Sequence, residues 1–241
     1  MEKTKQTLDM YYSLKTRIPE LMSNWDLDDT WAKEIWKQGF FVGAEKLTNE
    51  LDRVVIFGFY SEEFNIYSAY KGLLMNLELR MCEDYYLKDI VIIDYKNITA
   101  KAVLRITLPS AKKFADCTLK GYNVRIRSIH AINTSPITEV LINMLKMLLR
   151  NKLADRLYVY GSDLTELYKH VPRSLLPKEY GGENGTIREI DSAWKNKMKS
   201  YRNWFIEHEK KKSDETKRPN RQDYNNDLFG YDGSFRQLSI D

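Results

Sequence analysis

The sequence predicts an α/β fold in which helices flank a mostly parallel β-sheet. Along the middle of the chain, short apolar runs rich in β-branched residues alternate with segments of helical composition, as they do in a sheet covered by helices. The segments between consecutive strands are long enough for helical crossovers, which favour parallel pairing. A strongly amphipathic segment over residues 135–149 predicts a further helix between two of these strands.

Composition narrows the class of protein. The 241 residues suit one domain with appendages, and a hydrophobic fraction of 43% is enough for a sizeable core. The formal net charge of only +4 gives no argument for nucleic acid, so we expect no such partner and any basic function must be local. Cys82 and Cys117 are the only cysteines, and their spacing matches neither a metal site nor a disulfide framework, so we expect a reducing, cytoplasmic setting. The polar N-terminus is unlike a signal peptide, and no apolar run reaches the roughly 18 residues that span a bilayer.

The first third of the chain predicts two helices and a strand. Residues 3–17 have a helical composition that stops before Pro19. Residues 28–37 form a second helix that ends at Gly39. The apolar run 53–59 is rich in β-branched residues and predicts a buried strand.

A long helix follows this strand. Ser61 is its candidate N-cap, and helical composition continues to about Tyr85. The segment is apolar over so much of its surface that we expect burial on more than one side. It forms either the central core or part of the wall of a pocket.

The middle of the chain supplies three more strands, expected at residues 89–94, 125–132 and 155–160. Thr99 is a candidate cap for a helix after the first of these. Pro109 suits the first turn of another helix, which continues to a glycine stop at Gly121.

The helix expected over residues 135–149 has a narrow polar stripe on a broad apolar surface. Glu139, Asn143, Lys146 and Arg150 form the stripe, at i, i+4, i+7 and i+11. One interpretation is an ordinary crossover helix packed on the sheet. The other is an amphipathic lid that covers a lipid when closed and meets a membrane when open.

The C-terminal part predicts one helix and a tail. Thr186 and Glu189 have the spacing of a capping box, and a helix follows to about Lys210. From residue 211 the composition is polar. Large apolar residues interrupt it and predict a tail pinned on the surface of the body: Leu228, Phe229, Tyr231, Phe235 and Leu238.

Several blocks taken together resemble the CRAL-TRIO family, and in particular its tocopherol-transfer branch. They are the strand that ends at Asp94, the strand 125–133, the amphipathic helix with its lid pattern, residues 152–163, and the turn Leu176-Pro177-Lys178-Glu179-Tyr180-Gly181-Gly182. The resemblance covers about residues 1–210. It implies that one hydrophobic lipid is enclosed under a mobile lid, with no cofactor, no metal and no catalytic activity.

The resemblance also implies a division of the chain. Residues 1–45 would be a partial helical N-terminal region, 46–210 the lipid-binding domain and 211–241 a tail packed on the body. The family has further helices before the segment that matches Met1, so the N-terminal region is short and truncated by comparison. We therefore expect uncovered apolar surface near Tyr11 and Tyr12. The lid also departs from the family, with Lys146-Met147-Leu148 in place of Lys-Pro-Phe.

The implied ligand is a small lipid of the tocopherol, retinoid or similar isoprenoid kind, transferred inside the cell. Apolar residues of the sheet and of the helices beside it are the expected lining: Leu74, Leu77, Val91, Ile93, Ile106, Phe114, Tyr122, Ile126, Ile129, Ile137, Leu141, Met144, Leu145 and Leu148.

A basic cluster is the expected contact with the membrane. In the tocopherol-transfer branch, basic residues beside the lid bind phosphoinositide headgroups, and the matching positions here are Arg125, Arg127, Lys152 and Arg156. A guanidinium group suits phosphate geometry. The structural alternative is a solvated surface or ion pairs, with Asp155 as a partner. If the cavity is filled or incidental, the chain is instead a phosphoinositide-sensing module.

Catalysis has little support in the sequence. Ser128 and His130 share one strand face and Asp94 could approach them, but the Gly-X-Ser-X-Gly turn that exposes a nucleophile is missing. We expect His130 to be a hydrogen-bonded histidine of the core or the pocket.

Overall fold

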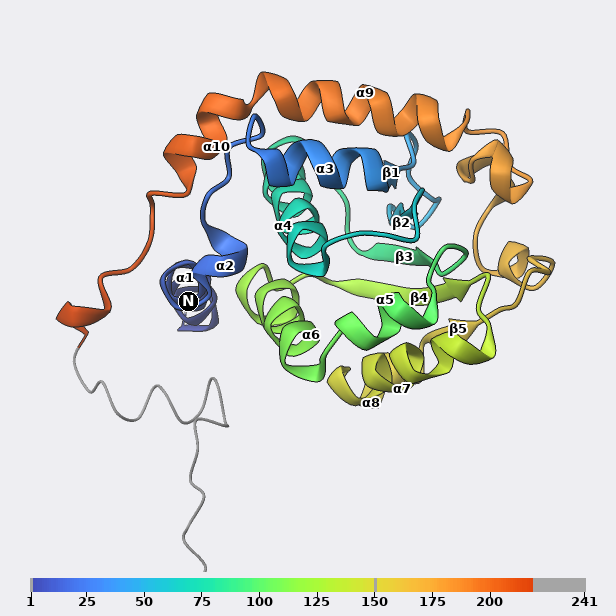
Figure 1. Cartoon of the computed structure of the whole chain (residues 1–241), viewed down its shortest axis with the longest axis horizontal. Helices are drawn as coiled ribbons and strands as arrows, with labels where there is room; N and C mark the ends of the chain where they lie inside the picture. Colours follow the sequence, from blue (N-terminus) through green and yellow to red (C-terminus); the bar gives the residue numbers. More distant parts are fainter. Residues whose placement is uncertain (1, 150, 219–241) are drawn as a thin grey trace, which may run out of the picture.

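A computed structural model of the chain describes residues 2–149 and 151–218 (Figure 1). Within that part, one sheet has five strands in the order β1-β2-β3-β4-β5. The strands β2 to β5 pair in parallel, as the helical crossovers predict, and β1 is antiparallel to β2. The strands are β1 (Gly39–Gly43), β2 (Arg53–Phe59), β3 (Asp89–Asp94), β4 (Ile126–Ile132) and β5 (Leu157–Val159).

The strand β1 is absent from our prediction. It consists of only five residues between α3 and the following loop, too few to show an alternating pattern. Its pairing with β2 places it in the sheet, although it lies inside the region 1–45 that we expected to be helical.

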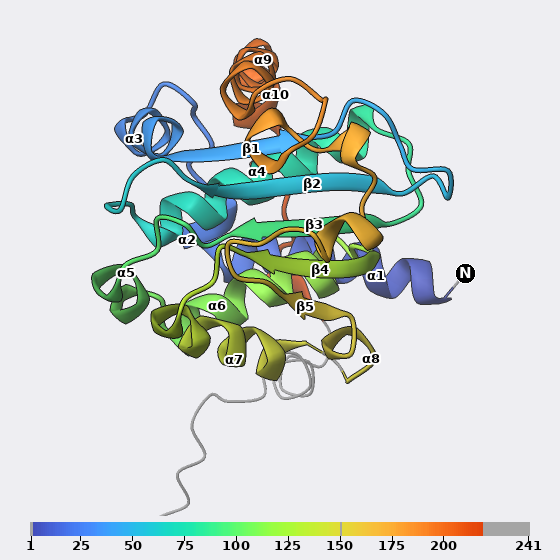
Figure 2. The same cartoon turned by 90° about the vertical axis from the view of Figure 1, so that its right-hand side faces the viewer.

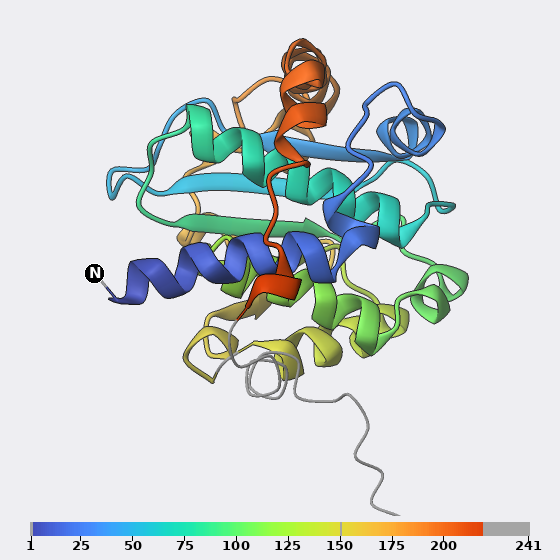
Figure 3. The ribbon, with the colours of Figure 1, turned by 90° about the vertical axis from the view of Figure 1, so that its left-hand side faces the viewer.

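The helices flank the sheet and surround its edges (Figures 2 and 3). They are α1 (Glu2–Arg17), α2 (Pro19–Met22), α3 (Thr30–Gln38), α4 (Ile66–Glu83), α5 (Ala100–Arg105), α6 (Leu108–Ala115), α7 (Glu139–Leu148), α8 (Asn151–Ala154), α9 (Ile187–Ser200) and α10 (Arg202–His208). Short 3-10 turns and a π-helical turn over Asp116–Gly121 complete the described chain.

Two expected helix boundaries are wrong. Asn65, and not Ser61, caps α4, because its side-chain oxygen accepts a hydrogen bond from Ser68 N. Ser61 instead accepts from Glu63 N in the preceding turn. The helix expected from Thr186 to Lys210 breaks at Tyr201, whose N–H bonds back to Met198 and Lys199, so α9 and α10 are separate.

Several local signals are confirmed. Thr99 caps α5, and Pro109 lies in the first turn of α6. The capping box of Thr186 and Glu189 starts α9. Each of these signals lies within one turn of its helix, so the local sequence contains the whole of it.

Alternation along the strands separates the two faces of the sheet. Val54, Ile56, Ile90 and Ile92 point to a core that the segment after β5 closes (Figure 2). The turn Leu176–Gly182 ends that segment. Gly181 has φ +69°, and a Cβ on Gly182 would lie 2.0 Å from the carbonyl oxygen of Leu176, so both positions require glycine.

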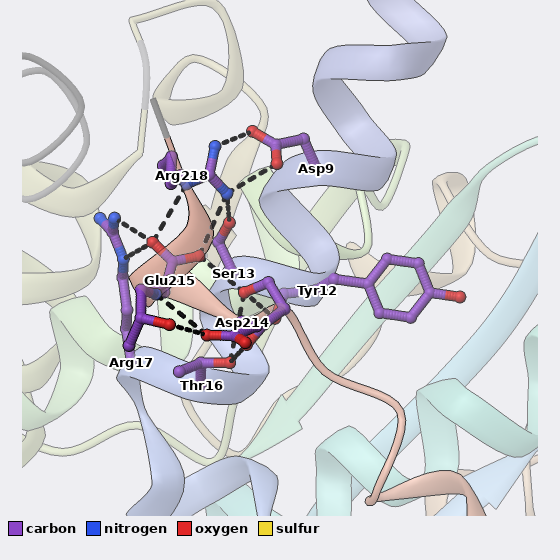
Figure 4. A network of polar contacts seen from close by, with 10 residues as sticks. Asp9, Tyr12, Ser13, Thr16, Arg17, Asp214, Glu215 and Arg218 are labelled. Atoms are coloured by element: carbon purple, nitrogen blue, oxygen red, sulfur yellow. Dashed lines mark hydrogen bonds and ion pairs between the residues drawn. The ribbon is translucent and has the colours of Figure 1, made fainter. Parts of the chain in front are cut away.

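The described part of the C-terminal tail crosses α1 (Figures 3 and 4). We call residues 213–218 the strap. Ser213 N donates to the carbonyl oxygen of Tyr12, Arg218 forms a bidentate pair with Asp9, and Arg17 donates to Glu215 at 2.6 Å. Burial opposes the ionisation of Glu215, but hydrogen bonds from Arg218, Ser213 and Arg17 outweigh it and lower the pKa to about 2. The expected anchors from Leu228 to Leu238 lie outside the described residues.

The expectation of uncovered apolar surface near Tyr11 and Tyr12 is confirmed only in part, because Tyr12 is 37% and Leu8 54% exposed whereas Tyr11 is covered. Tyr11 is buried, with its ring edge-on to Tyr122 and its hydroxyl bonded to the buried carboxylate of Glu78. The strap passes over the backbone of Tyr12.

Replacing Glu215 with glutamine should release the strap. The substitution removes the charge that Arg17 and Arg218 share, at a cost on the order of 1–2 kcal/mol. We therefore expect roughly tenfold faster proteolysis after Lys210–Lys212 under native conditions. The control Glu207→Gln makes the same charge change at a highly exposed carboxylate paired with Lys210. Equal cleavage of both variants would mean that the ion pairs do not hold the strap.

Candidate functional site

A cavity of about 250 Å³ lies between the sheet and the helices on the face opposite the core described above. Alternate strand residues form its floor, and register brings them together, since Val55 lies beside Val91 and Phe57 beside Ile93. Side chains of α4, α6 and α7 form the walls. Protein interiors contain few voids larger than a water molecule, so a space of this size is a candidate ligand site.

The structure places most of the expected pocket residues around this cavity. Eleven of the fourteen line it: Leu77, Val91, Ile93, Ile106, Phe114, Ile126, Ile129, Leu141, Met144, Leu145 and Leu148.

The other three lie elsewhere. Leu74 is fully buried on the side of α4 that packs against the N-terminal helices, because the cavity takes the side with Leu73 and Leu77. Tyr122 turns toward Glu78 and donates to its carboxylate at 2.5 Å. Ile137 is 49% exposed, because it belongs to the 3-10 turn Pro136–Thr138 before α7.

Sequence reasoning missed part of the lining. In the first two strands, the missed residues include Phe41, Val55, Phe57 and Phe59. The alternation in β2 could have identified Val55 and Phe57, since the neighbouring strand was already expected to contribute every second residue. Phe41 could not be found in this way, because β1 itself was missed.

The helix α7 closes one side of the cavity. Leu141, Met144, Leu145 and Leu148 form a single stripe at i, i+3, i+4 and i+7 that faces inward. Asn143 and Lys146 of the expected polar stripe are exposed, while Arg150 lies outside the described residues. Val140 and Met147 are apolar yet 58% and 69% exposed, so the outer face of α7 also carries apolar surface.

The basic residues lie at the end of the sheet where the parallel strands β4 and β5 begin. The carbonyl oxygen of Arg125 accepts from Asp89 N, and that of Arg156 accepts from Ile129 N. Lys152 lies on α8, one turn before Arg156. Arg125, Lys152 and Arg156 are exposed and have no ion-pair partner among residues 2–149 and 151–218.

Arg127 differs from the other three. Its Nε donates to the carboxylate of Asp52 at 2.6 Å, and Asp52 is almost fully buried while the arginine side chain is 42% exposed. The ion pair that we considered for these arginines therefore exists, but its acid is Asp52 and not Asp155.

His130 lies in β4 and is fully buried. Its ring nitrogens share hydrogen bonds with Ser128 Oγ at 2.8 Å and with Tyr160 Oη at 3.0 Å. Asp94 accepts instead from Tyr180 and Asn133, so it does not complete a triad with this pair. Burial, and then the nearby His170, lower the pKa of His130 to about 4.

The buried ring predicts a loss of stability in mild acid. The pKa of His130 is about 4 in the folded chain against 6.5 ordinarily, so between these values the unfolded chain binds the extra proton. The free energy of unfolding should fall by on the order of 3 kcal/mol as pH drops from 6.5 to 4. Urea denaturation at several pH values measures this, and His130→Gln should flatten that part of the profile. Parallel profiles for parent and variant would contradict a neutral buried His130.

The profile of the CRAL/TRIO domain matches residues 54–182, more than half of the chain. The chain belongs to the CRAL/TRIO domain family. The matched range runs from β2 to the double glycine after Tyr180, so it contains most of the cavity.

Relatives of this CRAL/TRIO domain include a human protein named "Alpha-tocopherol transfer protein-like", which is 29% identical over 202 residues. The Mus musculus protein of the same name is 30% identical over the same length, and both alignments cover 80% of this chain and 56% of the relative. Human Clavesin-2 is 26% identical over 188 residues, which cover 75% of this chain and 54% of that protein. The chain thus spans about half the length of the curated relatives it matches.

A solved structure, "Crystal structure of Sfh5", superposes with a TM-score of 0.52 at 12% identity and covers 73% of this chain and 64% of that one. This similarity supports the fold alone. Of the helices in the described ranges, none combines the length and the apolar character needed to cross a membrane.

Proposed function

We propose that this CRAL/TRIO domain binds a small hydrophobic lipid and transfers it between membranes, without a reaction of its own. The observation that carries the proposal is the apolar cavity of about 250 Å³ beneath α7. Enclosing a lipid there would stabilise the complex by about 25 cal/mol for each Å² of apolar surface removed from water. The name of the tocopherol transfer protein-like relatives supports a tocopherol, a retinoid or a similar isoprenoid as the cargo.

In this proposal α7 is the lid. Its inner stripe covers the cargo, and opening would expose that stripe together with the outer residues Val140 and Met147. An amphipathic helix with apolar residues on both sides of a thin polar stripe suits the boundary between headgroups and acyl chains. Delivery would then occur where the lid meets a membrane.

The basic cluster (Arg125, Arg127, Lys152 and Arg156) is the proposed contact with phosphoinositide headgroups. Three of its members are exposed and available, and Arg127 is oriented through Nε by Asp52. Attraction to an anionic leaflet would be peripheral and transient, with each cation contributing about 1 kcal/mol. Both cysteines are free, which agrees with action in the reducing cytoplasm.

Mass spectrometry of solvent extracts from the purified protein tests this function. A small lipid present in stoichiometric amount after expression in a lipid-rich host is the expected result. Repeated absence of such a lipid, with vesicle binding retained, would favour a phosphoinositide-sensing module without a dedicated cargo.

A further inference from the structure

One end of the cavity is polar. Arg80, in the last turn of α4, and Asp89, the first residue of β3, both line it, while most other lining residues are apolar. The two side chains are 3% and 2% exposed, and Arg80 Nη2 lies 2.6 Å from Asp89 Oδ1. An ion pair removed from water in this way carries a desolvation cost, which additional hydrogen bonds must offset.

The pair has an unused donor. A guanidinium group offers five N–H groups, and Asp89 accepts from Nη1 and Nη2. Nε is buried and has no hydrogen-bond acceptor among the described residues. Asp84 Oδ2 lies 3.7 Å from Nε, and Arg53 already binds that carboxylate through two nitrogens.

The opposite end of the cavity offers a comparison. Asp94, the last residue of β3, also lines the space. Its carboxylate accepts from Lys96 N, Asn133 Nδ2 and Tyr180 Oη. Asp94 therefore has three hydrogen-bond donors within the described chain, whereas Arg80 Nε has no acceptor there, and an unsatisfied buried donor costs about 1–3 kcal/mol.

The charges at the Arg80 end limit what could satisfy this donor. Asp89 already neutralises Arg80, so a ligand carboxylate would be repelled by Asp89 and an ammonium group by Arg80. A hydrocarbon would leave Nε unsatisfied. A neutral hydroxyl or carbonyl oxygen accepts the hydrogen bond without adding charge.

We propose, on the basis of the proposed carrier function, that Arg80 anchors the single neutral oxygen of the lipid and so fixes its orientation. The polar group lies beside Asp89, and the apolar body extends along β3 toward Asp94, a distance of about 16 Å at roughly 3.3 Å per residue. The polar group of the lipid is then at the end of the sheet where the parallel strands begin, which is also where the basic cluster lies. The ligand class is a hydrophobic alcohol, phenol, aldehyde or ketone.

A competition experiment tests this orientation. The parent protein is loaded from detergent with an equimolar mixture of hexadecane, hexadecan-1-ol and hexadecanoate, and the bound lipids are quantified by mass spectrometry. We expect the alcohol to be enriched about tenfold or more over both competitors, the effect of one hydrogen bond to a charged group.

Two variants locate the source of that preference. Replacing both members of the pair, Arg80→Met with Asp89→Leu, keeps the volume and leaves no unpaired charge, so the fold should persist. The amount of lipid bound should stay the same while the preference over hexadecane falls about tenfold. Arg80→Lys keeps a cation opposite Asp89 but has no Nε, and it should lose much of the preference as well. The control Ile106→Val, elsewhere in the lining, should leave the ratios unchanged.

The outcomes distinguish the orientation from the carrier function. Equal uptake of the three lipids, or a preference for the carboxylate, would overturn the role of Arg80 while the carrier function stands. A preference for the alcohol that survives in both Arg80 variants would do the same. Failure of the parent to bind any of the three would overturn the carrier function and this inference together.

Discussion

Replacing Leu145 with aspartate is expected to speed dissociation of a bound lipid by about 100-fold or more. Leu145 lies on the inner stripe of α7 and lines the cavity. A carboxylate facing apolar surface without a partner costs several kcal/mol, and about 3 kcal/mol already corresponds to a factor of about 100. Transfer of a fluorescent lipid from the protein to acceptor vesicles measures the rate.

The matched control for this substitution is Asn143→Asp. It makes the same change of charge two residues away on the exposed side of α7, so the dissociation rate should stay near that of the parent. Near-ultraviolet circular dichroism checks that the Leu145 variant keeps its tertiary packing. A folded variant with an unchanged rate would show that α7 does not cover the ligand.

Removing three exposed cations should abolish most binding to anionic vesicles. The triple substitution Arg125→Ala, Lys152→Ala and Arg156→Ala removes about 1 kcal/mol per residue, which predicts a loss of roughly 100-fold for phosphoinositide vesicles. The loss should shrink as salt rises, because exposed charges are screened over about 8 Å at physiological ionic strength. Vesicle co-sedimentation at several salt concentrations measures both effects.

Arg127 is kept in this experiment for a structural reason. Its removal would leave Asp52 buried without a counter-charge, a loss on the order of 3–5 kcal/mol that would confound the result. A second triple variant at Lys33, Lys37 and Lys199 removes the same charge from α3 and α9, at the other end of the sheet (Figure 2). Equal loss in both variants would indicate a general effect of net charge and would return the basic cluster to a structural role.

The sequence by itself determined the parts of this protein that depend on neighbours along the chain. Short apolar runs rich in β-branched residues located β2 and β3 with the bounds that the structure has. The spacing of Thr186 and Glu189 located the start of α9. The inward stripe of α7 follows from helical periodicity, because residues three and four apart share a face whatever they contact.

Only the tertiary structure decided which partners meet across long separations. Asp52 and Arg127 are 75 residues apart, and no local pattern selects one acid among many for that arginine. The same limit applied to α4, which is apolar on most sides. Its sequence pattern could not show that Leu77 faces the cavity whereas Leu74 packs against the N-terminal helices. Arg80 likewise could not be predicted as a cavity residue, because its position beside Asp89 depends on how α4 packs against β3. Local patterns specify which residues are buried, whereas the packing of distant elements specifies what each buried residue contacts.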